Sequence, residues 1–239
     1  MVYNILNGDS LAQSFPDSKI EGEIIVAREA LIDGDLSGEN LHDFWQSRAK
    51  QVGVTEAQYY HRVVSEFEKL MNAPANSEFN LWFEYDLFCQ VNMWFVISTI
   101  NQLPINKKVF AVYTSHLAKT NKNFWNGFGP ATTGELQFCF VDRIALHEVD
   151  LHVGDTLWNT YKHNDLDTLM RFAKNPRAAF PYLQEVIKAH VERFPTEGSV
   201  GRPERVLEEI IENGFSDFHD VFTEFWKRER AFMDSGMCS

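Results

Sequence analysis

Cysteine pairs and metal-binding patterns are missing from this sequence. Its 239 residues contain three cysteines, Cys89, Cys139 and Cys238, and no two of them have the C-x-x-C spacing. An odd number of widely spaced cysteines argues against a disulfide framework, so we expect two buried reduced thiols and one in the C-terminal tail. The eight histidines show no H-E-x-x-H spacing, and we therefore predict no metal site.

Long apolar runs and an excess of positive charge are also missing. The longest apolar stretch, residues 91–100, is interrupted by Asn92 and Ser98 and is too short to span a bilayer. The N-terminus turns polar at once, unlike a signal peptide, so we expect a soluble cytoplasmic protein with no membrane partner. The formal net charge is −12, from 22 basic and 34 acidic residues. A nucleic-acid-binding protein needs a basic face, so nucleic acid is disfavoured as a partner.

The residues that are present indicate a globular α/β fold. Hydrophobic residues make up 44% of the chain, which is enough for a large core. Short apolar runs predict strands at residues 2–6, 23–27, 79–83 and 108–113. Helical spacing of apolar residues, with a capping box at Thr55, predicts helices between them. This alternation is typical of a mostly parallel sheet with helices on its faces, so we predict a Rossmann-like three-layer domain.

The alternation of strands and helices stops in the second half of the chain. Residues 118–134 are rich in Asn, Lys, Gly and Thr and indicate a loop. The short apolar run at 136–141 fits a strand or a helix equally well. Further along, helices are predicted at 149–161, 166–173, 180–194, 203–213 and 218–232. We therefore predict an α/β domain over residues 1–117, a linker over 118–134, and an all-helical domain over 135–239.

Polar side chains follow each of the first three predicted strands. These candidate site residues are Asp9, Ser10, Arg28, Glu29, Glu84, Asp86 and Gln90. The carboxyl ends of parallel strands meet at one edge of a sheet, so we expect these residues to gather in one cleft. Such a cluster can hold a metal, act as acid and base, or bind a polar or phosphate-bearing ligand.

Structural roles are the alternative for the same residues. Asp9, Ser10 and Asp86 are of the types that cap helices, and Glu29 can form an ion pair with Arg28 or Arg48. The sequence contains no G-x-G-x-x-G and no P-loop, so it identifies no cofactor. Whether the protein is an enzyme, and its oligomeric state, are left open at this point.

Residues 8–11 also spell the Gly-Asp-Ser-Leu motif of the GDSL lipases and esterases. In that hypothesis Ser10 is the nucleophile of a serine hydrolase. The family's late Asp-x-x-His is missing, because the nearest matches, Asp150-Leu151-His152 and Asp217-Phe218-His219, are each one residue too short. A Gly-x-Asn-Asp block is missing as well. Since a triad needs all its roles filled, the sequence disfavours this hypothesis.

The C-terminal helices suggest a function of a different class. A predicted helix at 203–213, the turn Asn213-Gly214, and a predicted helix at 218–232 have the outline of a helix-turn-helix. The second helix begins with acidic rather than basic residues, so we interpret the pair as a packing hairpin. The alternative function is a regulatory or interaction protein whose C-terminal helices contact another macromolecule.

Three spaced stretches resemble a bacterial family called domain of unknown function 1835. They are ILNGDSLA at 5–12, GEIIVAREAL at 22–31 and LWFEYDLFCQ at 81–90. Residues 157–158, 165–169 and 201–222 are similar to the helical region that often follows in that family. The family usually reads Gly-Leu-Ser-x-Thr-Glu where this chain has Gly201-Arg202-Pro203-Glu204. The resemblance implies the α/β fold and a single site formed by the motif residues, and it implies no particular activity.

Overall fold

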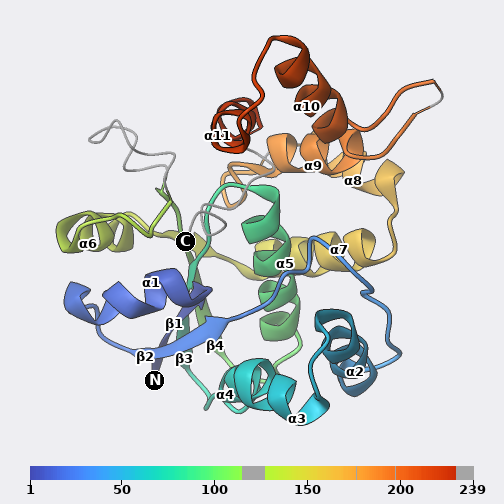
Figure 1. The fold of residues 1–239 in the computed structure, drawn as a ribbon. Helices are drawn as coiled ribbons and strands as arrows, with labels where there is room; N and C mark the ends of the chain where they lie inside the picture. Colours follow the sequence, from blue (N-terminus) through green and yellow to red (C-terminus); the bar gives the residue numbers. More distant parts are fainter. Residues whose placement is uncertain (115–126, 176, 197, 230–239) are drawn as a thin grey trace.

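A computed structural model describes residues 1–114, 127–175, 177–196 and 198–229. Its centre is a five-stranded sheet in the order β2-β1-β3-β4-β5 (Figure 1). The strands are β1 Val2–Asn7, β2 Glu23–Ala27, β3 Ser77–Trp82, β4 Lys107–Val112 and β5 Ile144–Leu146. The first four run parallel, and β5 pairs antiparallel with β4. The predicted α/β fold class, with a mostly parallel sheet followed by helices, is confirmed.

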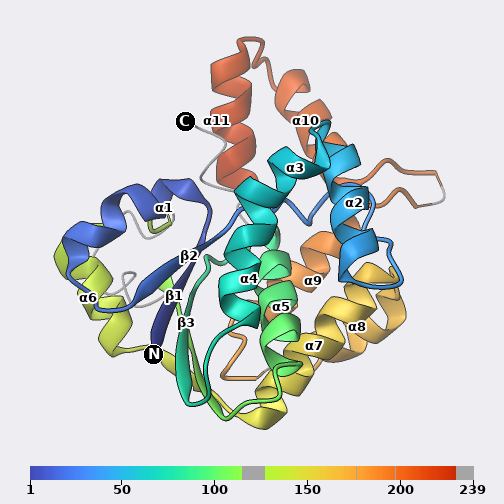
Figure 2. The same cartoon turned by 90° about the horizontal axis from the view of Figure 1, so that it is seen from below.

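Helices cover both faces of this sheet. The helices of the described residues are α1 Asp9–Ser14, α2 Leu41–Val52, α3 Glu56–Tyr59, α4 Ser65–Met71, α5 Leu87–Asn101, α6 Thr133–Val141, α7 Glu148–Lys162, α8 Leu166–Ala173, α9 Leu183–Glu192, α10 Arg202–Glu212 and α11 Phe218–Arg228. Figure 1 shows α10 and α11 away from the sheet. A 3-10 turn, η1 Phe15–Ser18, extends α1, and a π-helical turn, η2 Tyr60–Val64, joins α3 to α4. Figure 2 shows α1 and α6 on one side of the sheet and α4 and α5 on the other, with α7 and α8 beyond α5.

Helix α5 is the centre of the larger core. Thirteen of its 15 residues are buried, so it is apolar all round rather than amphipathic. It packs against α7 at Gly154, where an added Cβ would lie 2.4 Å from Cγ2 of Ile97. A side chain at Gly154 would therefore push the two helices apart, which explains a glycine in the middle of α7.

The chain beyond residue 127 answers one open point and differs from the prediction in one detail. The ambiguous run at 136–141 belongs to helix α6, which begins with a capping box from Thr132 to Glu135. Strand β5 then adds an edge to the sheet from within residues 135–239, the region predicted to be all-helical. A three-residue edge strand leaves too little periodicity to detect in a sequence. The division into two domains stays a prediction, and most of the predicted linker lies outside the described residues.

Within the described part of the chain, no helix has the length and apolar character needed to cross a membrane.

Candidate functional site

The first feature of the candidate site is its place in the sheet. From β1 the chain crosses to β2 on one side and then returns to β3 on the other side of β1. The connections that follow β1 and β3 therefore diverge, which leaves a crevice at the carboxyl ends of these two strands. A cavity of about 800 Å³ lies at this point. We call it the switch-point cavity, and its walls are residues 7–11, 27–30, 52, 54, 58–59, 62–63, 82, 84, 88 and 128–129.

Five of the seven predicted site residues lie on the wall of this cavity. They are Asp9, Ser10, Arg28, Glu29 and Glu84. They follow the carboxyl ends of β1, β2 and β3, as the sequence predicts. Asp86 and Gln90 are 2% and 1% exposed and lie behind the wall.

Asp9, Ser10 and Arg28 form the open side of the wall. Nε of Arg28 lies 2.7 Å from Oδ1 of Asp9, and Nη1 of Arg28 donates to the backbone carbonyl of Arg62 at 2.9 Å. The proposed capping role of Asp9 and Ser10 is wrong, because the N-cap of α1 is Gly8 and no side chain caps this helix. Asp9 pairs with Arg28 instead, so both side chains stay at the mouth of the cavity.

Glu29 forms the closed side of the wall. One carboxylate oxygen accepts from Nη2 of Arg48 at 3.0 Å and from the amide of Ala30 at 3.1 Å. The other accepts from the hydroxyl of Tyr59. Burial raises the pKa of Glu29, and the neighbouring Arg48 guanidinium opposes that rise. Arg48 also donates to the carbonyls of Asp33 and Ala30, so Glu29 belongs to a buried structural network.

Glu84 holds a distant segment over the cavity. Its Oε1 accepts from the amide of Phe128 at 2.5 Å, and its Oε2 accepts from the thiol of Cys89 at 3.3 Å. An added Cβ at Gly129 would lie 3.2 Å from Oγ of Ser10, so this segment closely approaches the β1–α1 turn. The Glu84 carboxylate therefore positions one wall of the cavity against another.

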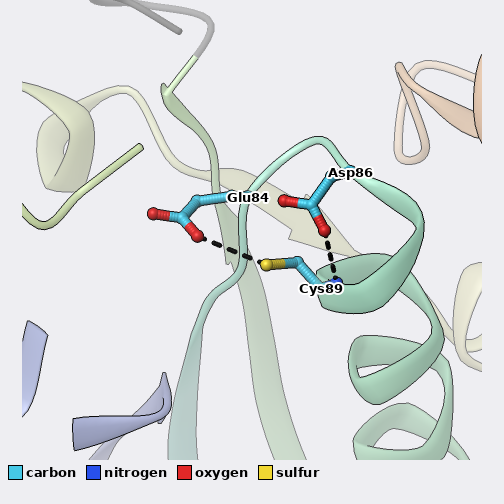
Figure 3. A group of neighbouring side chains, drawn as sticks. All are labelled: Glu84, Asp86 and Cys89. Carbon is cyan, nitrogen blue, oxygen red and sulfur yellow. Dashed lines mark hydrogen bonds between the residues drawn. The ribbon is translucent and has the colours of Figure 1, made fainter. Parts of the chain in front are cut away.

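Asp86 and Gln90 support Glu84 from behind. Asp86 is the N-cap of α5 and accepts from the amide of Cys89 at 2.9 Å, while Gln90 donates to the Glu84 carbonyl at 2.6 Å. Figure 3 shows the two hydrogen bonds that link Cys89 to Glu84 and Asp86. The capping role weighed for Asp86 is thus what the structure shows. Gln90 fixes the turn that carries Glu84 and lies outside the cavity wall.

Glu84, Asp86 and Cys89 also have the composition of a small metal site. Their candidate ligand atoms all lie within 4.8 Å of one another, and no other such group occurs among the described residues. In this arrangement the Glu84 and Asp86 carboxylates accept protein hydrogen bonds, and Asn7 donates its amide to Sγ of Cys89 at 3.0 Å. These contacts already account for the three side chains as a helix cap and a loop anchor, so we assign no metal to them.

Sequence reasoning missed Tyr59 and Arg62, which the structure places on the cavity wall. Arg62 belongs to the π-helical turn η2, and Tyr59 immediately precedes it. The capping box at Thr55 was predicted correctly, but the sequence predicted a continuous α-helix after it. Turns of this kind are rare and are found frequently at functional sites, and no sequence signal marked this one.

The serine-hydrolase hypothesis finds little support in the cavity. None of the described residues that line it is a histidine, so this part of the wall offers Ser10 no imidazole base. His152 is exposed on α7 and His219 is exposed at the start of α11, and neither lines the cavity.

Known proteins add no information on this site. Comparisons with models of protein families, with curated proteins and with solved structures find no match. A function for the chain therefore has to be argued from the geometry of the switch-point cavity.

Proposed function

We propose that this protein binds a small polar molecule in the switch-point cavity. The observation that carries the proposal is convergence, since the segments after β1, β2 and β3 supply Ser10, Arg28 and Glu84 to one cavity. Its volume of about 800 Å³ lies within the range of small-molecule sites, roughly 300–1,000 Å³. The proposal covers binding, with or without a chemical step on the bound molecule.

We also propose that the chain belongs to the family called domain of unknown function 1835. The three stretches that resemble this family are the segments that carry Asp9, Arg28 and Glu84 to the cavity. A cytoplasmic location is part of the same proposal. It is favoured by Cys89 and Cys139, which are both buried free thiols and would suit a reducing compartment.

The binding proposal is tested by a thermal-shift panel of nucleotides, sugar phosphates, amino acids and divalent metals. A ligand at about 100 times its dissociation constant stabilises a protein by about 2.7 kcal/mol, which is roughly 5–10 °C for a chain of this size. We expect one compound class to produce a shift of this order.

The matched variants are Ser10→Trp and Gln13→Trp. Ser10 lines the cavity, so an indole at this position would occupy part of it and obstruct a ligand, whereas Gln13 is exposed on the same helix and does not line it. The shift is expected to disappear in Ser10→Trp and to persist in Gln13→Trp. Asp86 is a poor choice for this test, because losing the buried cap of α5 would change stability by itself. A panel without any shift would contradict the proposal.

A second candidate function is protein binding by the α10–α11 hairpin. Helix α11 has no buried residue, and Phe218 and Ile211 are 82% and 58% exposed. Exposed apolar side chains of this kind are a feature of interaction surfaces. The double variant Phe218→Ser, Ile211→Ser is expected to leave the melting temperature nearly unchanged and to lower self-association or partner binding in sedimentation analysis. An unchanged sedimentation profile with every partner tested would contradict this candidate.

A further inference from the structure

We infer that the ligand of the switch-point cavity is an organic anion, whose phosphate or carboxylate group binds between Arg62 and Arg28. This inference rests on the proposed function and specifies its ligand class. It follows from three properties of the wall, namely which acceptors are occupied, which donors are free, and where apolar side chains are exposed.

The carboxylates of the wall already have protein partners. Both carboxylate oxygens of Glu29 and both of Glu84 accept hydrogen bonds from protein donors. Asp9, the third carboxylate, is paired with Arg28 through its Oδ1. A cationic ligand such as an amine would have to share a carboxylate that already has a protein partner, since among these carboxylate oxygens only Oδ2 of Asp9 has no described partner.

Several donor groups of the wall are free. Within the described part of the chain, nothing pairs with the guanidinium of Arg62 or with Nη2 of Arg28. The hydroxyl of Ser10 and the amide nitrogen of Gln58 also have no described partner, since Gln58 uses only its oxygen, as an acceptor from Thr55. Four donors without acceptors suit a ligand group that offers several acceptor oxygens, and guanidinium groups match phosphate and carboxylate best.

Exposed apolar side chains line another part of the cavity. Val52 and Val54 are 57% and 38% exposed, and the partly exposed Phe88 lies on the same wall. Covering them with a ring or an aliphatic body removes apolar surface from water, which favours binding. Inorganic phosphate alone would leave this surface uncovered, so the inferred ligand has both an anionic group and an apolar body.

The test uses four naphthalene compounds that share one ring system. They are 1-naphthyl phosphate and 1-naphthoate as anions, 1-naphthol as the neutral compound and 1-naphthylmethylamine as the cation. Calorimetric titration of the whole chain is expected to give tighter binding for at least one anion than for the neutral compound or the cation. Inorganic phosphate is expected to bind more weakly than 1-naphthyl phosphate, because it has no ring.

Arg62→Gln is the decisive variant, and Lys50→Gln is its control. Arg62 is exposed, so its loss should not unfold the protein, and Lys50 is an exposed cation of α2 that does not line the cavity. We expect Arg62→Gln to weaken anion binding about 10- to 100-fold, which is the usual range for a charge-assisted hydrogen bond. Lys50→Gln is expected to leave it unchanged.

The outcomes separate the inference from the proposed function. If 1-naphthol or the amine binds as tightly as the anions, or if Arg62→Gln binds anions like the wild type, the anion inference is wrong and the cavity remains a binding site. If none of these compounds binds and no compound of the thermal-shift panel produces a shift, both the anion inference and the proposed binding function are wrong. Anion binding that is lost in Arg62→Gln and kept in Lys50→Gln supports both.

Discussion

Arginine has a different role on each of the two sides of the switch-point cavity. On the closed side Arg48 is 1% exposed and donates to Glu29, Asp33 and Ala30. On the open side Arg62 is exposed, and its guanidinium meets no partner in the described chain. A buried ion must have its hydrogen bonds satisfied by the protein. An exposed ion is hydrated by water, so it stays available to bind a ligand. Burial, rather than residue type, thus separates the groups that hold this site from those that can bind.

The largest expected effect comes from breaking the closed side with Arg48→Met. This change leaves the buried Glu29 carboxylate without its cation, which typically costs about 3–5 kcal/mol. Urea unfolding should show a loss of this size, and Arg62→Met should change stability by no more than about 0.5 kcal/mol. Equal losses in the two variants would contradict the distinction between the two sides.

A second effect concerns His190, which is 2% exposed and so is buried like Arg48. Unlike Arg48, it has no hydrogen-bond partner on either ring nitrogen among the described residues. Burial lowers its pKa to about 3. The unfolded chain, with an imidazole pKa near 6.5, therefore binds a proton that the folded chain does not bind between about pH 6.5 and pH 3.

The free energy of unfolding should therefore fall as the pH falls below 6.5. The contribution of His190 is about 1.4 kcal/mol per pH unit, or roughly 3 kcal/mol between pH 6.5 and 4.5. Urea unfolding of wild type and His190→Phe across this range isolates it, because carboxylates contribute to both proteins alike. Identical pH slopes for the two proteins would refute this account of His190.

A smaller loss is expected for Glu84→Ala. The buried amide of Phe128 then lacks its acceptor, which costs about 2 kcal/mol. The segment that closes the cavity is also released, so we expect ligand affinity to fall together with stability. Calorimetry and urea unfolding on the same variant measure both quantities. A variant that loses neither would show that Glu84 does not anchor this segment.

The smallest effect is expected on the open side itself. Asp9→Asn removes a partly exposed ion pair with Arg28, and such pairs contribute under about 1 kcal/mol. The substitution removes the negative charge beside the Arg28 guanidinium, whose Nη1 still donates to the Arg62 carbonyl, so anion binding should stay the same or tighten. Weaker anion binding in Asp9→Asn would mean that the carboxylate itself contacts the ligand.

Much of the fold could be predicted because its signals are local. Four strands were predicted close to their observed positions, and the helix predicted between the third and fourth of them is α5. Strand β5 was missed because three residues are too few to show the alternation of apolar and polar residues that marks a strand. The π-helical turn at 60–64 was missed because its apolar spacing differs little from that of an α-helix.

The candidate site was predictable in outline only. Parallel strands bring Asp9, Arg28 and Glu84 to one edge, and this much follows from their order in the chain. Which arginine pairs with Glu29 depends on how α2 packs, and the sequence left Arg28 and Arg48 as alternatives. Nothing in the sequence singles out Arg62, because only the tertiary arrangement of η2 places it on the cavity wall.

The most direct test of the account is the dissociation constant of 1-naphthyl phosphate for Arg62→Gln relative to wild type, measured by calorimetry at equal ionic strength. We expect a ratio of about 10 or more, with the urea midpoint of the variant unchanged. A ratio near one, with wild type binding the compound, would contradict the assignment of Arg62 as the ligand-binding cation of the open side.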